Sequence, residues 1–194
     1  IFYLAFKLTS EQRRIVFLLG ALMLEHRSIM LHAVCGAGKT EIIALTIANH
    51  LRRGAKVGWA IARRDVVIEL KERLATYFKA TECIALYQDS PDLGKDGQLV
   101  VLTTARLQHF YQSFDILVLD ENVAFPFTVS HFQQHVADTS VKPRGNILYI
   151  SATITKQEKR EYAKTISLSK RFHGENLPVI TFEYYSMSKQ HRKM

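Results

Sequence analysis

The sequence predicts an α/β domain with a central, mostly parallel sheet. Short apolar segments rich in Val, Ile and Leu alternate with longer segments in which apolar residues recur at helical spacing. A parallel sheet needs this alternation, because each strand must return to the same end of the sheet through a crossover segment. The expected strands cover residues 28–34, 56–62, 83–87, 98–103, 115–119 and 146–151.

The expected helices fall between these strands. We expect Ser10 to cap a helix over 11–25, because apolar residues follow it at helical spacing. A second helix is expected from Lys39 to a stop at Gly54, and Asp65 is expected to cap a third. Further helices are expected near 105–111, 128–137 and 156–164, and a last strand over 178–185.

The composition fits one ordinary globular domain. The chain has 194 residues, of which 47% are hydrophobic and 23% charged, so it can bury one core but is too short for two stacked lobes. We therefore expect one domain over 1–185, followed by a basic tail or the start of a linker over 186–194. The sequence begins with Ile rather than Met, which suggests that the natural chain is longer.

The charge balance favours a polyanionic partner. Lys and Arg total 26 and Asp and Glu total 18, a net charge of +8, which suits nucleic acid or an anionic membrane surface. Cys35 and Cys83 lack metal-binding spacing and fit a reducing, cytoplasmic setting. No apolar stretch is long enough to span a bilayer, no signal-peptide pattern opens the given sequence, and the histidines form no zinc motif.

A phosphate-binding loop follows the first expected strand. The sequence AVCGAGKT at 33–40 lies between a strand and a helix, which is the context that the P-loop motif requires. Lys39 is expected to reach the β- and γ-phosphates of ATP, and the Thr40 hydroxyl to bind Mg²⁺. The other phosphate contacts are expected from backbone N–H groups at Gly36, Ala37 and Gly38. A plain glycine turn with a surface lysine is the alternative.

Two adjacent carboxylates end the apolar strand at 115–119. Asp120 is expected to hold the Mg²⁺ ion, and Glu121 to orient and deprotonate the attacking water. An acidic pair after a strand is, on its own, more often an exposed turn. The phosphate loop upstream is what favours the catalytic interpretation.

The strand at 146–151 leads into Ser151, Ala152 and Thr153. Small hydroxyl residues there can hydrogen-bond the acidic pair or the γ-phosphate region, so we assign these three residues to coupling. The order of phosphate loop, acidic pair and Ser-Ala-Thr is similar to that of superfamily 2 helicases. It predicts a RecA-like P-loop NTPase lobe.

Two weaker features fit the same plan. Gln12 precedes the first strand, where its amide could read the adenine of ATP, although a surface glutamine fits equally well. Residues that directly follow strands could hold the backbone of single-stranded nucleic acid, with solvated charges and a helix cap as the alternative. These residues are Arg63, Arg64, Thr103, Thr104 and Arg106.

Nearly the whole chain resembles the ComFA family of late competence proteins, helicase-like ATPases that help Gram-positive bacteria take up single-stranded DNA. The most discriminating feature is the Ala-Phe-Pro extension behind the acidic pair, which general superfamily 2 helicases lack. Asn122 and Val123 depart from the family, which usually has Val then Asp there. The residues that carry the resemblance include Gln12, 33–41, Asp120-Glu121, Ala124-Phe125-Pro126-Phe127, Ser151-Ala152-Thr153 and Arg171-Phe172-His173.

The resemblance implies an ATP-driven motor that moves along single-stranded DNA with a membrane DNA channel and other competence proteins as partners. It also implies a second RecA-like lobe that supplies an arginine finger, so that this lobe alone turns over ATP very slowly. The location implied is cytoplasmic, with peripheral attachment to the inner face of the cell membrane as an option. Two other interpretations stay open: a lobe of another superfamily 2 DNA or RNA helicase, and a nucleotide-dependent scaffold without hydrolysis.

Overall fold

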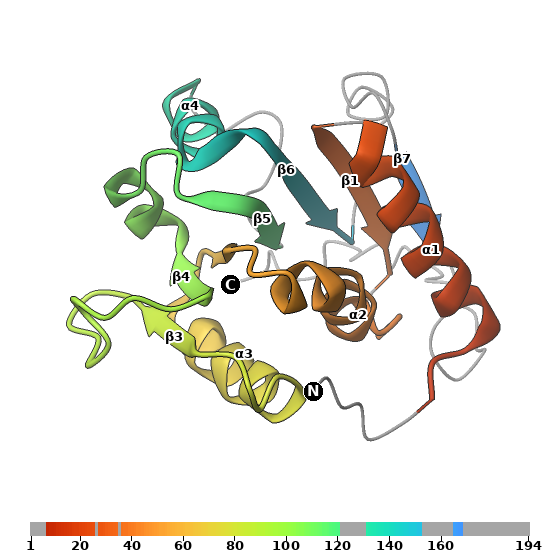
Figure 1. The fold of residues 1–194 in the computed structure, drawn as a ribbon, viewed down its shortest axis with the longest axis horizontal. Helices are drawn as coiled ribbons and strands as arrows, with labels where there is room; N and C mark the ends of the chain where they lie inside the picture. Colours follow the sequence, from red (N-terminus) through yellow and green to blue (C-terminus); the bar gives the residue numbers. More distant parts are fainter. Residues whose placement is uncertain (1–6, 26, 35, 121–130, 153–164, 169–194) are drawn as a thin grey trace, which may run out of the picture.

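Seven parallel strands form one sheet at the centre of the molecule (Figure 1). The computed structural model describes residues 7–25, 27–34, 36–120, 131–152 and 165–168, without the side chains of 131–133. The strand order is β3-β4-β2-β5-β6-β1-β7, and every pairing is parallel, which confirms the predicted fold class. The strands are β1 (Ser28–Ala33), β2 (Val57–Ile61), β3 (Cys83–Leu86), β4 (Leu99–Thr103), β5 (Phe114–Asp120), β6 (Val141–Ser151) and β7 (Thr165–Leu168).

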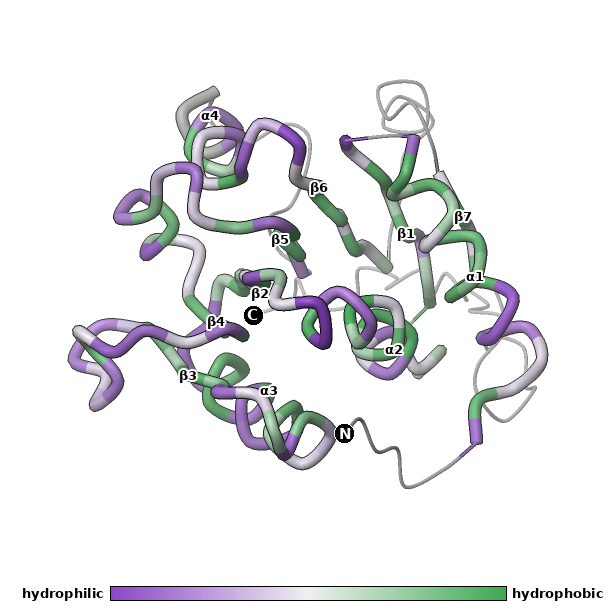
Figure 2. Tube along the Cα trace, in the orientation of Figure 1, coloured by the Kyte–Doolittle hydropathy of each residue, from purple (hydrophilic) through white to green (hydrophobic). Residues whose placement is uncertain are grey.

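Helices cover both faces of this sheet. One buried apolar cluster joins α1, α2 and α3 to one face, and a second joins η1 and α4 to the other. Along β5, Ile116 and Val118 belong to the first cluster and Leu117 and Leu119 to the second, as expected for alternating side chains. Figure 2 shows the strands as a hydrophobic layer. The helices are α1 (Ser10–Glu25), α2 (Lys39–Arg52), α3 (Arg64–Tyr77), α4 (His131–Ser140) and the 3₁₀ helix η1 (Thr104–His109).

The predicted caps of two helices are wrong. Thr9, not Ser10, caps α1: its hydroxyl accepts from the Gln12 N–H at 3.2 Å, and the Gln12 side-chain oxygen accepts from the Thr9 N–H at 2.9 Å. This is a capping box, which satisfies two backbone donors reciprocally. Arg63 is the cap residue of α3, without a side-chain cap hydrogen bond, and Asp65 lies in the first turn. A carboxylate there still favours the helix start through the helix dipole.

The predicted strands agree with the structure to within one residue at each end, except that β6 begins at Val141 instead of residue 146. Lys142, Pro143, Arg144 and Gly145 resemble a turn in sequence, which hid this extension. Gly145 is needed because a Cβ there would lie 2.7 Å from the Asp115 carbonyl, where the β5–β6 register is irregular.

The strand β7, which pairs with β1, was not predicted from the sequence. The predicted helix at 105–111 is the 3₁₀ helix η1. The predicted helix at 156–164 and strand at 178–185 lie outside the described residues.

A polar link joins α2 to α3 within the apolar layer. The side chain of Glu41 is 4% exposed and pairs with Arg73, whose side chain is 46% exposed. The Tyr77 hydroxyl donates to the same Glu41 oxygen at 3.0 Å, and Arg73 Nε donates to Tyr77 Oη at 3.0 Å. Burial opposes charge on Arg73, but Tyr77 and Glu41 outweigh it and raise the pKa of Arg73. The buried carboxylate therefore has its charge balanced by a partner that reaches solvent.

We predict that Arg73→Leu lowers the free energy of unfolding by about 2 kcal/mol, because it leaves the Glu41 carboxylate buried without a countercharge. Glu41→Gln in the same chain should recover part of this loss, since no buried charge then remains. Urea denaturation of the two single variants and the double variant measures both effects. Arg52→Leu, an exposed change on α2, is the control and should cost under about 0.5 kcal/mol. Strictly additive losses in the double variant would contradict the explanation.

Candidate functional site

The loop between β1 and α2 has the backbone geometry of a phosphate cradle. Gly36 and Gly38 have φ angles of 77° and 78°, in the left-handed region that glycine enters without strain. A Cβ on Gly36 would meet no atom within 4 Å, so this side of the loop is open. Lys39 and Thr40 then form the first turn of α2, where the helix dipole favours an anion. The predicted loop residues therefore come together, apart from Cys35, which lies outside the described residues.

Gln12 lies buried beneath this loop, with 2% of its surface exposed. Its Nε2 donates to the Ala37 carbonyl at 2.9 Å, while its Oε1 accepts from the Thr9 N–H. A Cβ on Gly38 would lie 2.5 Å from Gln12 Nε2, so glycine is also required there for close packing. The described contacts thus assign Gln12 to holding the loop. Its expected contact with adenine stays a prediction.

Asp120 ends β5 at the same edge of the sheet as the phosphate loop. Its side chain follows the alternation of Ile116 and Val118, which places it on the face covered by α2. Only β6 lies between β5 and β1, so the two strands are about 10 Å apart, two strand spacings. A hydrated metal ion can bridge such a gap between Asp120 and the start of α2. Glu121 lies outside the described residues.

The end of β6 contacts β1 just before the phosphate loop. Ser151 is paired with His32 in the ladder, and His32 Nε2 lies 3.2 Å from the Ala152 carbonyl oxygen. The first two residues of the predicted coupling segment are therefore connected to the strand that leads into the loop. Thr153 lies outside the described residues.

Two residues near these groups were missed by the sequence analysis. His32 contacts Ala152, and Trp59 of β2 donates from Nε1 to Asp120 Oδ2 at 3.2 Å. His32 is a polar residue in an apolar strand, which was an available signal, whereas Trp59 looks like an ordinary core residue in sequence. A single such residue is usually a core residue, so sequence alone did not identify its partner.

The five candidate nucleic-acid residues also lie at the carboxyl edge of the sheet. Ile61 pairs with Thr103, so the segments after β2 and β4 are neighbours. Three of the five have contacts with other side chains. Arg63 pairs with Asp65, Arg64 lies over the Tyr87 ring at 4.7 Å, and Arg106 Nη1 is 3.4 Å from His109 Nε2. The Asp65 hydrogen bond raises the pKa of Arg63.

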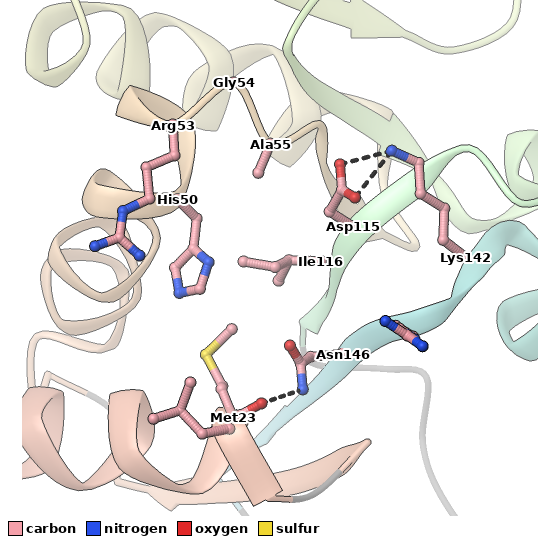
Figure 3. A pocket seen from close by; sticks show the side chains of 11 residues that line it. Met23, His50, Arg53, Gly54, Ala55, Asp115, Ile116, Lys142 and Asn146 are labelled. Atoms are coloured by element: carbon pink, nitrogen blue, oxygen red, sulfur yellow. Dashed lines mark hydrogen bonds and ion pairs between the residues drawn. The ribbon is translucent and has the colours of Figure 1, made fainter.

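A pocket of about 520 Å³ lies at the opposite edge of the sheet (Figure 3). Its acidic and amide groups are satisfied within the protein: Lys142 Nζ lies 2.9 Å from both Asp115 carboxylate oxygens, and Asn146 donates to the Met23 carbonyl. Burial and the neighbouring Arg53 lower the pKa of His50 there. The pocket lacks a glycine loop and faces the C-terminal end of α2, so the nucleotide site is not expected here.

Comparison with known proteins identifies the family of this chain. Residues 11–161 match the DEAD/DEAH box helicase family. The competence protein ComFA of Bacillus subtilis (strain 168) is 32% identical over 176 residues, and the alignment covers 89% of this chain and 38% of that protein. The competence protein ComFA of Streptococcus pneumoniae (strain ATCC BAA-255 / R6) is 36% identical over 157 residues, and that alignment covers 79% of this chain and 36% of that protein.

A solved structure shows the same fold at lower sequence identity. The UvsW helicase of bacteriophage T4 superposes with a TM-score of 0.67 at 12% identity, covering 84% of this chain and 61% of that one. This chain spans less than two fifths of the length of the two ComFA relatives that it matches. It belongs to the DEAD/DEAH box helicase family, as a ComFA-like first lobe of the superfamily 2 type.

Proposed function

We propose that residues 1–185 form the ATP-binding lobe of a motor that hydrolyses ATP and moves along single-stranded DNA. The observation that carries the proposal is the phosphate loop at the start of α2, on the same face and edge of the sheet as Asp120. Similarity to two competence proteins supports a role of the intact protein in DNA uptake during transformation. Its partners would then be single-stranded DNA, a membrane DNA channel and other competence proteins.

The residues of the site fit a magnesium nucleotide. Thr40 offers a hydroxyl in the first turn of α2, and Asp120 offers a carboxylate two strands away, which are ligands that Mg²⁺ accepts. When bound, Mg²⁺ would neutralise charge on the phosphates. Lys39 would hold the β- and γ-phosphates, while Glu121 is proposed to take a proton from the attacking water. Ser151, Ala152 and Thr153 would report hydrolysis through the contact of Ala152 with His32.

We predict that Lys39→Ala weakens ATP binding at least tenfold, because the phosphates lose their cationic partner. Glu121→Gln should keep ATP affinity but abolish hydrolysis. Equilibrium binding of a fluorescent ATP analogue and phosphate release measure the two effects. Lys95→Ala, in the exposed loop between β3 and β4, is the control and should change neither. Unchanged affinity in Lys39→Ala would refute the nucleotide site.

The isolated lobe should hydrolyse ATP very slowly. In the motors it resembles, an arginine from a second lobe stabilises the transition state and contributes about 10³–10⁵ in rate. We therefore predict that the isolated lobe binds ATP but shows no appreciable steady-state hydrolysis. Phosphate release with and without single-stranded DNA measures this. The full-length protein is the comparison. Equal turnover by the lobe and the full-length protein would contradict the need for a second lobe.

Nucleic-acid binding is proposed for the residues that follow β2 and β4. Arg63→Ala and Arg106→Ala should weaken binding of single-stranded DNA uniformly across sequences, because both would contact phosphates. Each lost contact should reduce the slope of log K against log salt concentration by about 0.7. Fluorescence anisotropy at several salt concentrations measures this, with Arg52→Ala on α2 as the control. An unchanged salt slope in both variants would remove these residues from the interface.

The two other interpretations make different predictions for the intact protein. Another superfamily 2 helicase could show ATPase stimulation by RNA instead of single-stranded DNA. A scaffold that does not hydrolyse ATP would retain DNA uptake with Glu121→Gln, whereas a motor would lose it. For the location, we propose the cytoplasm or the inner face of the cell membrane. None of the described helices is long and apolar enough to cross a membrane.

A further inference from the structure

We infer that Trp59 is a positioning residue that fixes the carboxylate of Asp120 for magnesium binding. The inference rests on the proposed function, because it assigns Asp120 to the metal. Trp59 is fully buried in β2, and its indole Nε1 donates to Asp120 Oδ2 at 3.2 Å. An indole nitrogen is only a donor, so it suits an ionised carboxylate that accepts.

The position of Trp59 explains why a large side chain is needed. In the β2–β5 ladder Trp59 pairs with Val118, while Asp120 pairs with Ile61. Trp59 and Asp120 are therefore diagonal neighbours on the same face. Such neighbours are offset by one strand spacing and two residues along the strand, about 8 Å in all, a gap that a large aromatic side chain can close. The indole reaches across this gap and presents its N–H to the carboxylate.

Burial makes this hydrogen bond restrictive. Trp59 belongs to the apolar cluster beneath α2 and α3, so its ring is held on several sides. A buried indole N–H without an acceptor would be unfavourable, and Asp120 supplies that acceptor. The carboxylate is held in turn by a donor that cannot move freely. Partners of this kind, one step away from a metal, typically change metal affinity by about 10–100-fold.

The same contact gives the protein an internal reporter. Trp59 is the only tryptophan in the chain. A divalent cation bound near Asp120 changes the electric field at the indole, so the tryptophan emission should change when magnesium nucleotide binds. The signal requires no label and comes from one known position.

The test compares the parent chain with Trp59→Phe, which keeps an aromatic ring but removes the N–H donor. A fluorescent ATP analogue is titrated with Mg²⁺ and, separately, with EDTA. We expect the affinity in EDTA to change less than twofold, while the gain in affinity due to Mg²⁺ falls about tenfold. In the double variant that combines Trp59→Phe with Asp120→Asn, the gain in affinity due to Mg²⁺ should be no smaller than in Asp120→Asn alone.

Val101→Ala is the matched control for packing. Val101 is fully buried, pairs with Trp59 in the β2–β4 ladder and belongs to the same apolar cluster. The Val101→Ala variant should lower the thermal midpoint of unfolding without reducing the gain in nucleotide affinity due to Mg²⁺. If Trp59→Phe reduces binding equally in Mg²⁺ and EDTA, or leaves the gain unchanged, the inference is wrong.

Tryptophan emission of the parent chain gives a second test that does not depend on the folding of Trp59→Phe. Titrating Mg²⁺ in the presence of ADP should change the emission, and Asp120→Asn should abolish the change. If the parent chain binds nucleotide in a Mg²⁺-dependent way but its tryptophan emission does not change, the role of Trp59 is overturned while the proposed function stands. Absence of any Mg²⁺-dependent nucleotide binding by the parent would overturn the proposed function and this inference together.

Discussion

The parallel pairing of all described strands is the constraint on which the rest of the structure depends. Because every strand runs in the same direction, the segments that follow the strands gather at one edge of the sheet. The loop at 34–38 follows β1, while Asp120 and Ser151 are the last residues of the neighbouring strands β5 and β6. Residues separated by more than a hundred positions in sequence thus come to the same edge of the sheet. The arginines and threonines after β2 and β4 share that edge for the same reason.

The strand order explains why polar side chains are found within the apolar layers. The α2 helix links β1 to β2, although β6 and β5 lie between these strands, so it crosses the face on which Asp120 lies. Few polar groups are tolerated there unless each has a partner. Glu41 is held by Arg73 and Tyr77, and Gln12 by the backbone of the phosphate loop. Glu41 thus joins α2 to α3, and Gln12 joins α1 to the loop that precedes α2.

The sequence predicted the fold class, six strands and the glycine turn between β1 and α2, because apolar periodicity and glycine spacing are local signals. It did not predict that Gln12 closes a capping box, since Thr9 and Ser10 are equally suited to cap a helix. Nor did it connect Trp59 with Asp120 or His32 with Ala152, because those pairs depend on strand order and register. The start of β6 was missed because Pro143 and Gly145 resemble a turn.

The pairing of β1 with β6 has a consequence for biosynthesis. Ser28 pairs with Ile147 and Met30 with Thr165, so the strand before the phosphate loop gains its neighbours only after most of the domain has been translated. Closing so long a loop is entropically unfavourable and slows folding. Until β6 arrives, β1 exposes apolar surface and unpaired backbone groups to the ribosomal environment. The strand that leads into the loop before α2 is therefore among the last to gain its place in the sheet.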